Sequence, residues 1–267
     1  MNLKIYGCRG SMPVYRADTV KYGGNTSCMV LSLGDTKLIL DAGSGILPYY
    51  WENSSNGFKS ADILISHLHI DHIIGLPLFL PHLRDLPQAN IYTCSRNDEP
   101  LAEQVLGIFR PPYWPVNILD SVSINCIEIH PDKSFEIGPF TITTFLADHP
   151  DQTYSFHITD GKKVLVHLLD NEVRKNWHGY NNMLKYCKNA DLVIFDAAYS
   201  AEEYKKHEGW GHSTIEEGIN LARENNIKKM VFGHFDQKFT DEDLDKWQSK
   251  IDPSRFILSK DGLEINF

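Results

Sequence analysis

The chain has 267 residues, of which 42% are hydrophobic, and its formal net charge is −9. A chain of this size can bury a full core as one large α/β unit, so we expect a single domain over residues 1–267. The negative charge and the lack of a basic stretch exclude a wide positive surface for extended nucleic acid. A small molecule or a protein is the expected partner.

The first residues, MNLKIYGCRG, run directly into a strand-like pattern without a signal peptide. No apolar run approaches the length needed to cross a bilayer. We therefore expect a soluble, cytoplasmic protein that does not bind membranes. The five cysteines are odd in number and form no CxxC pair, which indicates reduced, structural residues.

Strand patterns dominate the first part of the chain, in the segments NLKIYG, SCMVLSLG, TKLILDAG and ADILIS. Helical periodicity follows at 72–85 and 98–108. A second β-rich block covers 122–170, with a hairpin turn at Asp160 and Gly161. Further helices are predicted at 173–187, 214–226 and 241–249, between the strands DLVIFD and KKMVFG. Two β-blocks, each followed by helices, predict an αββα sandwich of two mixed β-sheets flanked by helices.

The segment ISHLHIDHIIGLP places three histidines and an aspartate directly after an apolar strand. A single histidine there is more often a hydrogen-bonded core residue than a ligand, but that explanation does not cover the whole group. Side chains of an extended segment alternate, so His67 and His69 face the same way and can bind one metal ion. Asp71 and His72 follow where a helix begins, and they point to a second ion nearby.

Two metal ions need further ligands, and three polar residues end other predicted strands. His149 precedes a proline, Asp170 follows the apolar run VLVHLL, and His234 follows Gly233. Each one alone is as easily an ordinary loop residue. Together they predict the rest of a site with seven nitrogen and oxygen ligands.

With these residues, the sequence resembles the metallo-β-lactamase superfamily, whose signature is HxHxDH followed by separate His, Asp and His ligands. The resemblance covers nearly the whole chain and includes GCRGSMP, YGGNTSC, LILDAGSGI, DHP, LLDNE, GHSTIEEGINLA and GHFD. It implies that His67, His69 and His149 hold one metal ion. It also implies that Asp71, His72 and His234 hold the other, with Asp170 as the bridge.

Within this superfamily, GGNTSC, GHSTIEEG and FRPPYWPV are similar to the phosphodiesterase and tRNase Z branch. The resemblance implies a proton-donating pair of Asp196 and His212. A leaving oxygen needs a proton, and a histidine oriented by a carboxylate can supply it. The alternative is that His212 only precedes a helix, with Ser213 and Glu216 as its capping box.

Two positions depart from the hydrolase pattern of that branch. Leu169 precedes Asp170 where a small or hydroxyl residue is usual, and the segment TYSFHI has His157 where relatives often have an arginine. An arginine at that position could bind the phosphate of a substrate, so its absence weakens the case for a hydrolase. The remaining arginines that are candidates for binding a substrate phosphate are Arg9, Arg84 and Arg110.

Aromatic residues gather in the segment FRPPYWPV, where Phe109, Tyr113 and Trp114 are expected to form a dry lid over the metal ions. Leu169 is expected to help keep water away from the site. His82, ten residues after His72, fits a helix end or surface position better than a place behind the metal ligands.

We first expect a diiron protein that binds O2 as a peroxo adduct for oxygen or iron sensing. The overall sequence is similar to the oxygen-binding diiron proteins, which are associated with chemotaxis, so a chemoreceptor or kinase signalling protein is the implied partner. Iron is the expected metal, although zinc and manganese also suit the ligands. The alternative is a metal-dependent phosphodiesterase acting on a cyclic nucleotide or another small phosphodiester, and the Asp196–His212 pair favours it. The sequence is compatible with a homodimer but does not decide the oligomeric state.

Overall fold

The structure is a computed structural model that describes residues 1–267 except 57, 59 and 84–88. Its strands form two seven-stranded sheets. In order across the first sheet, the strands are β14 (Glu264–Asn266), β1 (Asn2–Gly7), β2 (Cys28–Leu33), β3 (Thr36–Leu40), β4 (Ala61–Leu64), β5 (Ala89–Thr93) and β6 (Asn125–Glu128). Across the second sheet, they are β13 (Phe256–Leu258), β12 (Lys229–Gly233), β11 (Leu192–Asp196), β10 (Val164–Leu168), β9 (Tyr154–Thr159), β8 (Phe140–Leu146) and β7 (Ser134–Ile137).

Both sheets are mixed and follow the same plan. In the first sheet, β14 to β3 pair antiparallel and β3 to β6 pair parallel. In the second sheet, β7 to β10 pair antiparallel and β10 to β13 pair parallel. The predicted hairpin at Asp160 and Gly161 joins β9 to β10, and Gly161 has a φ of 82° that favours glycine. The carboxyl ends of the parallel strands lie at one edge, where polar side chains can meet.

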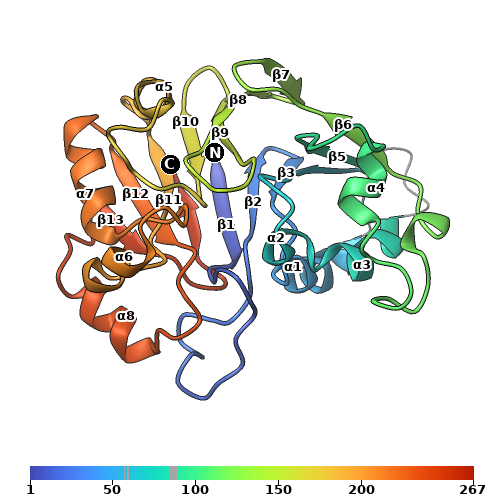
Figure 1. Cartoon of the computed structure of the whole chain (residues 1–267), viewed down its shortest axis with the longest axis horizontal. Coiled ribbons are helices and arrows are strands. Elements are labelled where there is room, and N and C mark those ends of the chain that lie inside the picture. Colours follow the sequence, from blue (N-terminus) through green and yellow to red (C-terminus); the bar gives the residue numbers. More distant parts are fainter. Residues whose placement is uncertain (57, 59, 84–88) are drawn as a thin grey trace.

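The eight helices of the described residues cover the outer faces of the sheets (Figure 1). On the side of the first sheet lie α1 (Ile46–Asn53), α2 (Ile70–Ile73), α3 (Leu76–Phe79) and α4 (Leu101–Leu106). On the side of the second sheet lie α5 (Tyr180–Cys187), α6 (Ala201–His207), α7 (Ile215–Glu224) and α8 (Asp241–Gln248). The predicted αββα sandwich of two mixed sheets flanked by helices is confirmed. Assignment of the whole chain to one domain stays a prediction.

Alternating side chains of the strands build two hydrophobic cores. In β2, Met29 and Leu31 pack into the core between the sheets, whereas Cys28 and Val30 pack toward α1 and α3. This alternation follows from the period of two in an extended strand, so one strand serves both layers. The four-layer arrangement leaves the strand ends as the place for polar groups.

The structure corrects some predicted helices. The predicted helix at 72–85 is broken: α2 ends at Ile73, and α3 begins at Leu76, because Gly75 and Pro77 interrupt the run. The predicted helix at 173–187 begins only at Tyr180. The sequence analysis missed α1 and α6. Among the described residues, none of the helices has the length and apolar character required to cross a membrane.

Candidate metal centre

Three histidines converge at the carboxyl ends of β4 and β8. His67 and His69 follow β4, and His149 follows β8. The ring centres of His67 and His149 are 4.9 Å apart, and those of His69 and His149 are 5.0 Å apart. One ligand atom from each histidine and one from Asp170 all lie within 4.8 Å of one another. The structure thus brings together, from both sheets, the residues that were predicted to bind the first metal ion.

A second group lies beside the first. Asp71 and His72 come from α2, and His234 follows β12. Asp71 Oδ2 lies 3.2 Å from His234 Nε2 and 3.4 Å from His72 Nε2. The ligand atoms of these three residues also lie within 4.8 Å of one another. The residues expected to form a second ion site are therefore adjacent.

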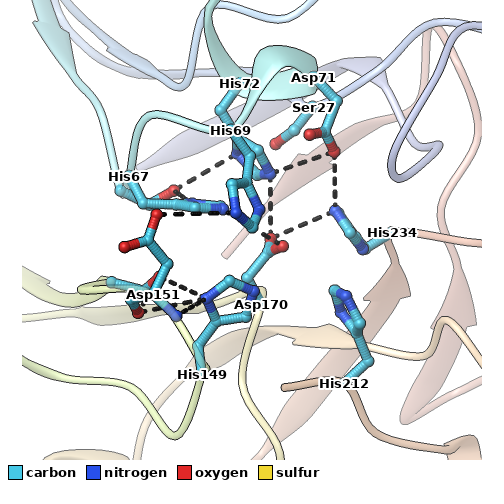
Figure 2. A network of polar contacts seen from close by, with 12 residues as sticks. Ser27, His67, His69, Asp71, His72, His149, Asp151, Asp170, His212 and His234 are labelled. Carbon is cyan, nitrogen blue, oxygen red and sulfur yellow. Dashed lines mark hydrogen bonds and ion pairs between the residues drawn. The ribbon is translucent and has the colours of Figure 1, made fainter. Parts of the chain in front are cut away.

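Asp170 lies between the two groups, as Figure 2 shows. Its Oδ1 is 3.7 Å from His67 Nε2, whereas its Oδ2 is 3.1 Å from His72 Nε2 and 3.2 Å from His234 Nε2. One carboxylate oxygen thus faces each group, and this is the geometry that a bridging ligand needs.

The ligand atoms fit metal ions because several of them have no other partner. Among the described residues, His67 Nε2, His72 Nε2 and Asp170 Oδ2 are buried and form no hydrogen bond. Buried polar atoms without a partner are costly, so such a cluster needs an occupant. Imidazole and carboxylate groups suit zinc, iron and manganese, and the donor set fits two such ions.

The two groups differ in electrostatics. Burial lowers the pKa of His67 well below its ordinary value, and the nearby His72 lowers it further. Burial also opposes protonation of His234, but Asp170, Asp71 and Asp196 outweigh it and raise its pKa to about 9. Three carboxylates, those of Asp71, Asp170 and Asp196, thus lie close to His234 in the second group.

Asp196 and His212 form the predicted pair beside the second group. The carboxylate of Asp196 is fully buried at the end of β11, and its Oδ2 lies 2.8 Å from His212 Nδ1. Backbone N–H groups of Asp170, Ala198 and Ser213 also donate to this carboxylate. The ring of His212 stacks on His234 at 5.0 Å. Asp196 thus fixes the orientation of His212, whose Nε2 is left to face a ligand.

The predicted capping box at Ser213 and Glu216 is wrong by one residue. Thr214 caps α7 and forms a capping box with Glu217. Ser213 Oγ instead donates to the carbonyl of Asn171 and accepts from the N–H of Val173. His212 is therefore two residues before the cap, and Ser213 ties its segment to the one that follows Asp170.

The residues expected to cover the site lie elsewhere. Tyr113 is 80% exposed and lines a surface pocket with Glu99 and Arg110. Trp114 packs against Phe109, beside the core under the first sheet. Neither forms the expected lid over the ligand groups. An exposed tyrosine at the outer end of the α4 loop cannot keep water away from the metal centre.

Leu169 packs in the core, and His82 lies at the exposed position that the sequence analysis favoured for it. Leu169 is buried in the hydrophobic core between the sheets, so its side chain packs there. The ring of His82 stacks on Tyr50 at 4.1 Å, and its Nδ1 lies 3.0 Å from the Tyr50 hydroxyl. The structure thus places His82 against α1, in agreement with the surface alternative.

Two of the three candidate phosphate-binding arginines, Arg9 and Arg110, have their partners elsewhere. Arg9 is fully buried and donates to backbone carbonyls of Gly23 and Phe239, which makes it a structural residue. Arg110 lies on the surface 3.5 Å from Glu103. Arg84 lies outside the described residues.

The sequence analysis missed two groups that orient ligands. Asp41 Oδ2 lies 2.8 Å from His72 Nδ1, and Thr153 Oγ1 lies 2.9 Å from His149 Nδ1. Such contacts fix the ring tautomer and direct the other nitrogen toward the ion. Asp41 ends the apolar run TKLIL, as the predicted ligand Asp170 ends VLVHLL, and this shared pattern was the available signal.

Comparisons with known proteins find relatives that are named ribonuclease Z and solved structures with the same fold. A ribonuclease Z of Picrophilus torridus is 21% identical over 314 aligned positions, which cover 99% of this chain and 95% of the relative. A ribonuclease Z of Clostridium perfringens is 27% identical and covers 90% of each chain. The crystal structure of the metallo-β-lactamase fold protein YhfI from Bacillus subtilis aligns with a TM-score of 0.74 and 20% identity, over 99% of this chain and 98% of that one.

These findings correct the first functional prediction. The relatives are named for an RNA hydrolase, and the aromatic lid expected to protect an oxygen adduct is absent from the described residues around the site. The prediction of a diiron oxygen sensor in chemotaxis is therefore wrong. A family model for the beta-lactamase superfamily domain matches residues 36–235, which is most of the chain. The chain belongs to this superfamily.

Proposed function

We propose that this protein is a metal-dependent phosphodiesterase and that the substrate is an RNA phosphodiester. The Asp196–His212 pair carries this proposal, because it places an oriented proton donor beside the ligand groups. The names of the relatives support RNA in place of the small phosphodiester expected from the sequence. The net charge of −9 favours contacts limited to the nucleotides around the cleaved bond.

We propose His67, His69 and His149 as ligands of one ion, and Asp71, His72 and His234 as ligands of the other, with Asp170 shared. When bound, such ions lower the pKa of water and polarise a phosphoryl oxygen. Hydrolysis needs no redox change, so we propose zinc as the resident ion, with manganese as the alternative. The preference for iron depended on the oxygen-sensing prediction and is abandoned with it.

The chain itself supplies the proton for the leaving oxygen. His212 Nδ1 faces Asp196, so His212 Nε2 is the nitrogen that can donate. The ring of His212 lies 5.0 Å from that of His234 and 5.7 Å from that of His149, so it borders both ligand groups. A phosphodiester bound between those groups would therefore place its leaving oxygen near His212.

Replacement of His212 by alanine tests the proposal. Loss of a general acid should slow cleavage of an unactivated RNA by roughly a hundred- to ten-thousand-fold. The metal content should not change, because the proposal makes His212 a proton donor and not a ligand. His130→Ala, which removes an exposed histidine, is the control and should leave the rate unchanged.

Rates are measured with zinc- and manganese-loaded protein, with metal content determined for each variant. Unchanged RNA cleavage by the His212→Ala variant would refute the general-acid role. Loss of one ion per chain in that variant would make His212 a ligand, as its position near Asp170 and His234 also allows.

A further inference from the structure

An exposed indole is linked to the proposed proton donor through two other rings. Trp210 is 59% exposed, two residues before His212. Its ring meets that of His207 edge-on at 4.8 Å, and His207 stacks on Tyr199 at 4.6 Å. Tyr199 in turn contacts His212 edge-on at 5.7 Å. A continuous row of rings therefore connects the exposed indole to the proposed general acid.

The loop that presents Trp210 is held in place by a buried carboxylate. Glu172 is 1% exposed and accepts hydrogen bonds from the backbone N–H groups of Gly209 and Gly211 and from the Tyr204 hydroxyl. Gly209 and Gly211 have φ values of 86° and 87°, so the backbone turns sharply on both sides of Trp210. These contacts fix the loop with its indole outside the core.

The same loop packs closely on a proposed metal ligand. A Cβ atom at Gly211 would lie 2.2 Å from Cδ2 of His149, so only glycine allows this approach. Trp210 is thus attached directly to the wall of the metal centre. Exposure alone would prove little, since Trp51 on α1 is 67% exposed at a site without such contacts.

We propose that Trp210 stacks on the base of the nucleotide that leaves when the phosphodiester is cleaved. The inference rests on the proposed function and specifies its substrate class as nucleotide diesters. His212 must reach the leaving oxygen, so the attached nucleoside has to lie on the His212 side of the centre. The loop of Trp210 joins this side through Gly211, which packs on His149. Base–aromatic stacking is insensitive to sequence and strengthens binding by roughly 5- to 150-fold per base.

The test compares two short RNAs with the same cleaved bond. One carries all its bases, and the other lacks the base of the leaving nucleotide, which is the product that carries the new free hydroxyl. Trp210→Ala should raise KM on the intact RNA by roughly 5- to 150-fold with little change in kcat. The same variant should act on the abasic RNA like the wild-type protein.

Two further variants make the result specific. Trp210→Phe keeps a ring and should recover most of the lost affinity, whereas Trp51→Ala should behave as the wild-type protein on both RNAs. An equal loss on the intact and the abasic RNA in Trp210→Ala would overturn the inference, because it would indicate a structural role.

A binding measurement separates this inference from the proposed function. Adenosine, which like the leaving product carries a free hydroxyl and no phosphate, should quench tryptophan fluorescence in the wild-type protein, and Trp210→Phe should remove most of that change. If this holds while the protein cleaves no diester, the stacking site stands and the proposed function falls. If cleavage depends on His212 but neither KM nor quenching depends on Trp210, the stacking site falls and the proposed function stands.

Discussion

Asp41 contacts the His72 nitrogen that faces away from the ligand groups. Its Oδ2 accepts from Ser27 Oγ and lies 2.8 Å from His72 Nδ1, and its Oδ1 accepts from the N–H of Ser66. The residue has a φ of 58°, which is uncommon outside glycine and indicates that the surrounding contacts hold it there. A buried carboxylate in this place keeps His72 Nε2 directed at Asp170.

Replacement of Asp41 by asparagine should weaken metal binding. The amide can still accept a hydrogen bond from His72, but it lacks the negative charge that makes the imidazole a better ligand. Loss of such a partner typically lowers metal affinity by about 10- to 100-fold. Competitive titration with a chromogenic zinc chelator measures the change.

Asp191→Asn serves as the control, because Asp191 is also buried but pairs with Lys163 and Lys228 away from the centre. Equal zinc affinities for the Asp41→Asn variant and the wild-type protein would show that Asp41 only stabilises the fold.

At the residue scale, the sequence predicted those site residues whose positions follow from the order of strands along the chain. His67, His69, Asp71 and His72 are neighbours, and His149, Asp170 and His234 each follow a strand, so the strand pattern located them. The covering residues could not be located in this way. Tyr113 and Trp114 were assigned to a lid because they are aromatic, but their position depends on how the loop after α4 packs, which no local pattern specifies.

The helix α7 packs against the second sheet through a glycine. A Cβ atom at Gly218 would lie 2.5 Å from Cε1 of Phe232 and 2.8 Å from Cδ1 of Phe195. Both rings are fully buried, so neither can move away freely. This close approach places the start of α7, and with it the segment of His212, against the ends of β11 and β12.

Gly218→Ala should therefore destabilise the protein, although alanine is the better helix former. The gain in helix propensity is about 1 kcal/mol, whereas an extra methyl group in a tightly packed core costs about 1–3 kcal/mol. We expect a net loss of about 1 kcal/mol in the free energy of unfolding, measured by urea denaturation.

Asn220→Ala tests the same helix on its exposed face, where only propensity acts, and should be neutral or slightly stabilising. A Gly218→Ala variant as stable as Asn220→Ala would show that the two phenylalanine rings can move away from the added methyl group.

At the element scale, periodicity predicted α7 and α8 to within two residues at each end but failed for 72–85. Apolar residues continue across Gly75 and Pro77, so the pattern alone suggests one helix. In the structure, Gly75 and Pro77 interrupt the run, and the backbone N–H of Gly75 donates to the carbonyl of Ala42, in a segment distant along the chain. Such a contact between distant segments is not encoded in the local pattern.

At the scale of the whole molecule, each ligand group draws on both sheets. His67, His69, Asp71 and His72 follow a strand of the first sheet, and His149, Asp170 and His234 follow strands of the second. The proposed ions would thus connect the two sheets at one edge. Binding should therefore stabilise the folded chain as a whole.

Removal of metal should lower the melting temperature, because a ligand at 100 times its Kd contributes about 2.7 kcal/mol to stability. Calorimetry with zinc and with a chelator measures this difference. Asp170→Ala should lose most of the difference, because it removes the shared ligand. The exposed Asp98→Ala should keep it. Two tightly bound ions per chain in Asp170→Ala would contradict the bridging role.

The order of the strands has one more consequence, for behaviour in concentrated solution. In the part of the chain that the structure describes, neither sheet closes on itself, and four strands have an open side: β14 and β6 in the first sheet, and β13 and β7 in the second. These strands have only three or four residues, whereas β8, which lies between β7 and β9, has seven. An open edge is a template for strand addition between molecules, and a short edge offers few unpaired backbone groups. The long, β-branched segments most able to seed aggregates are enclosed by neighbours on both sides.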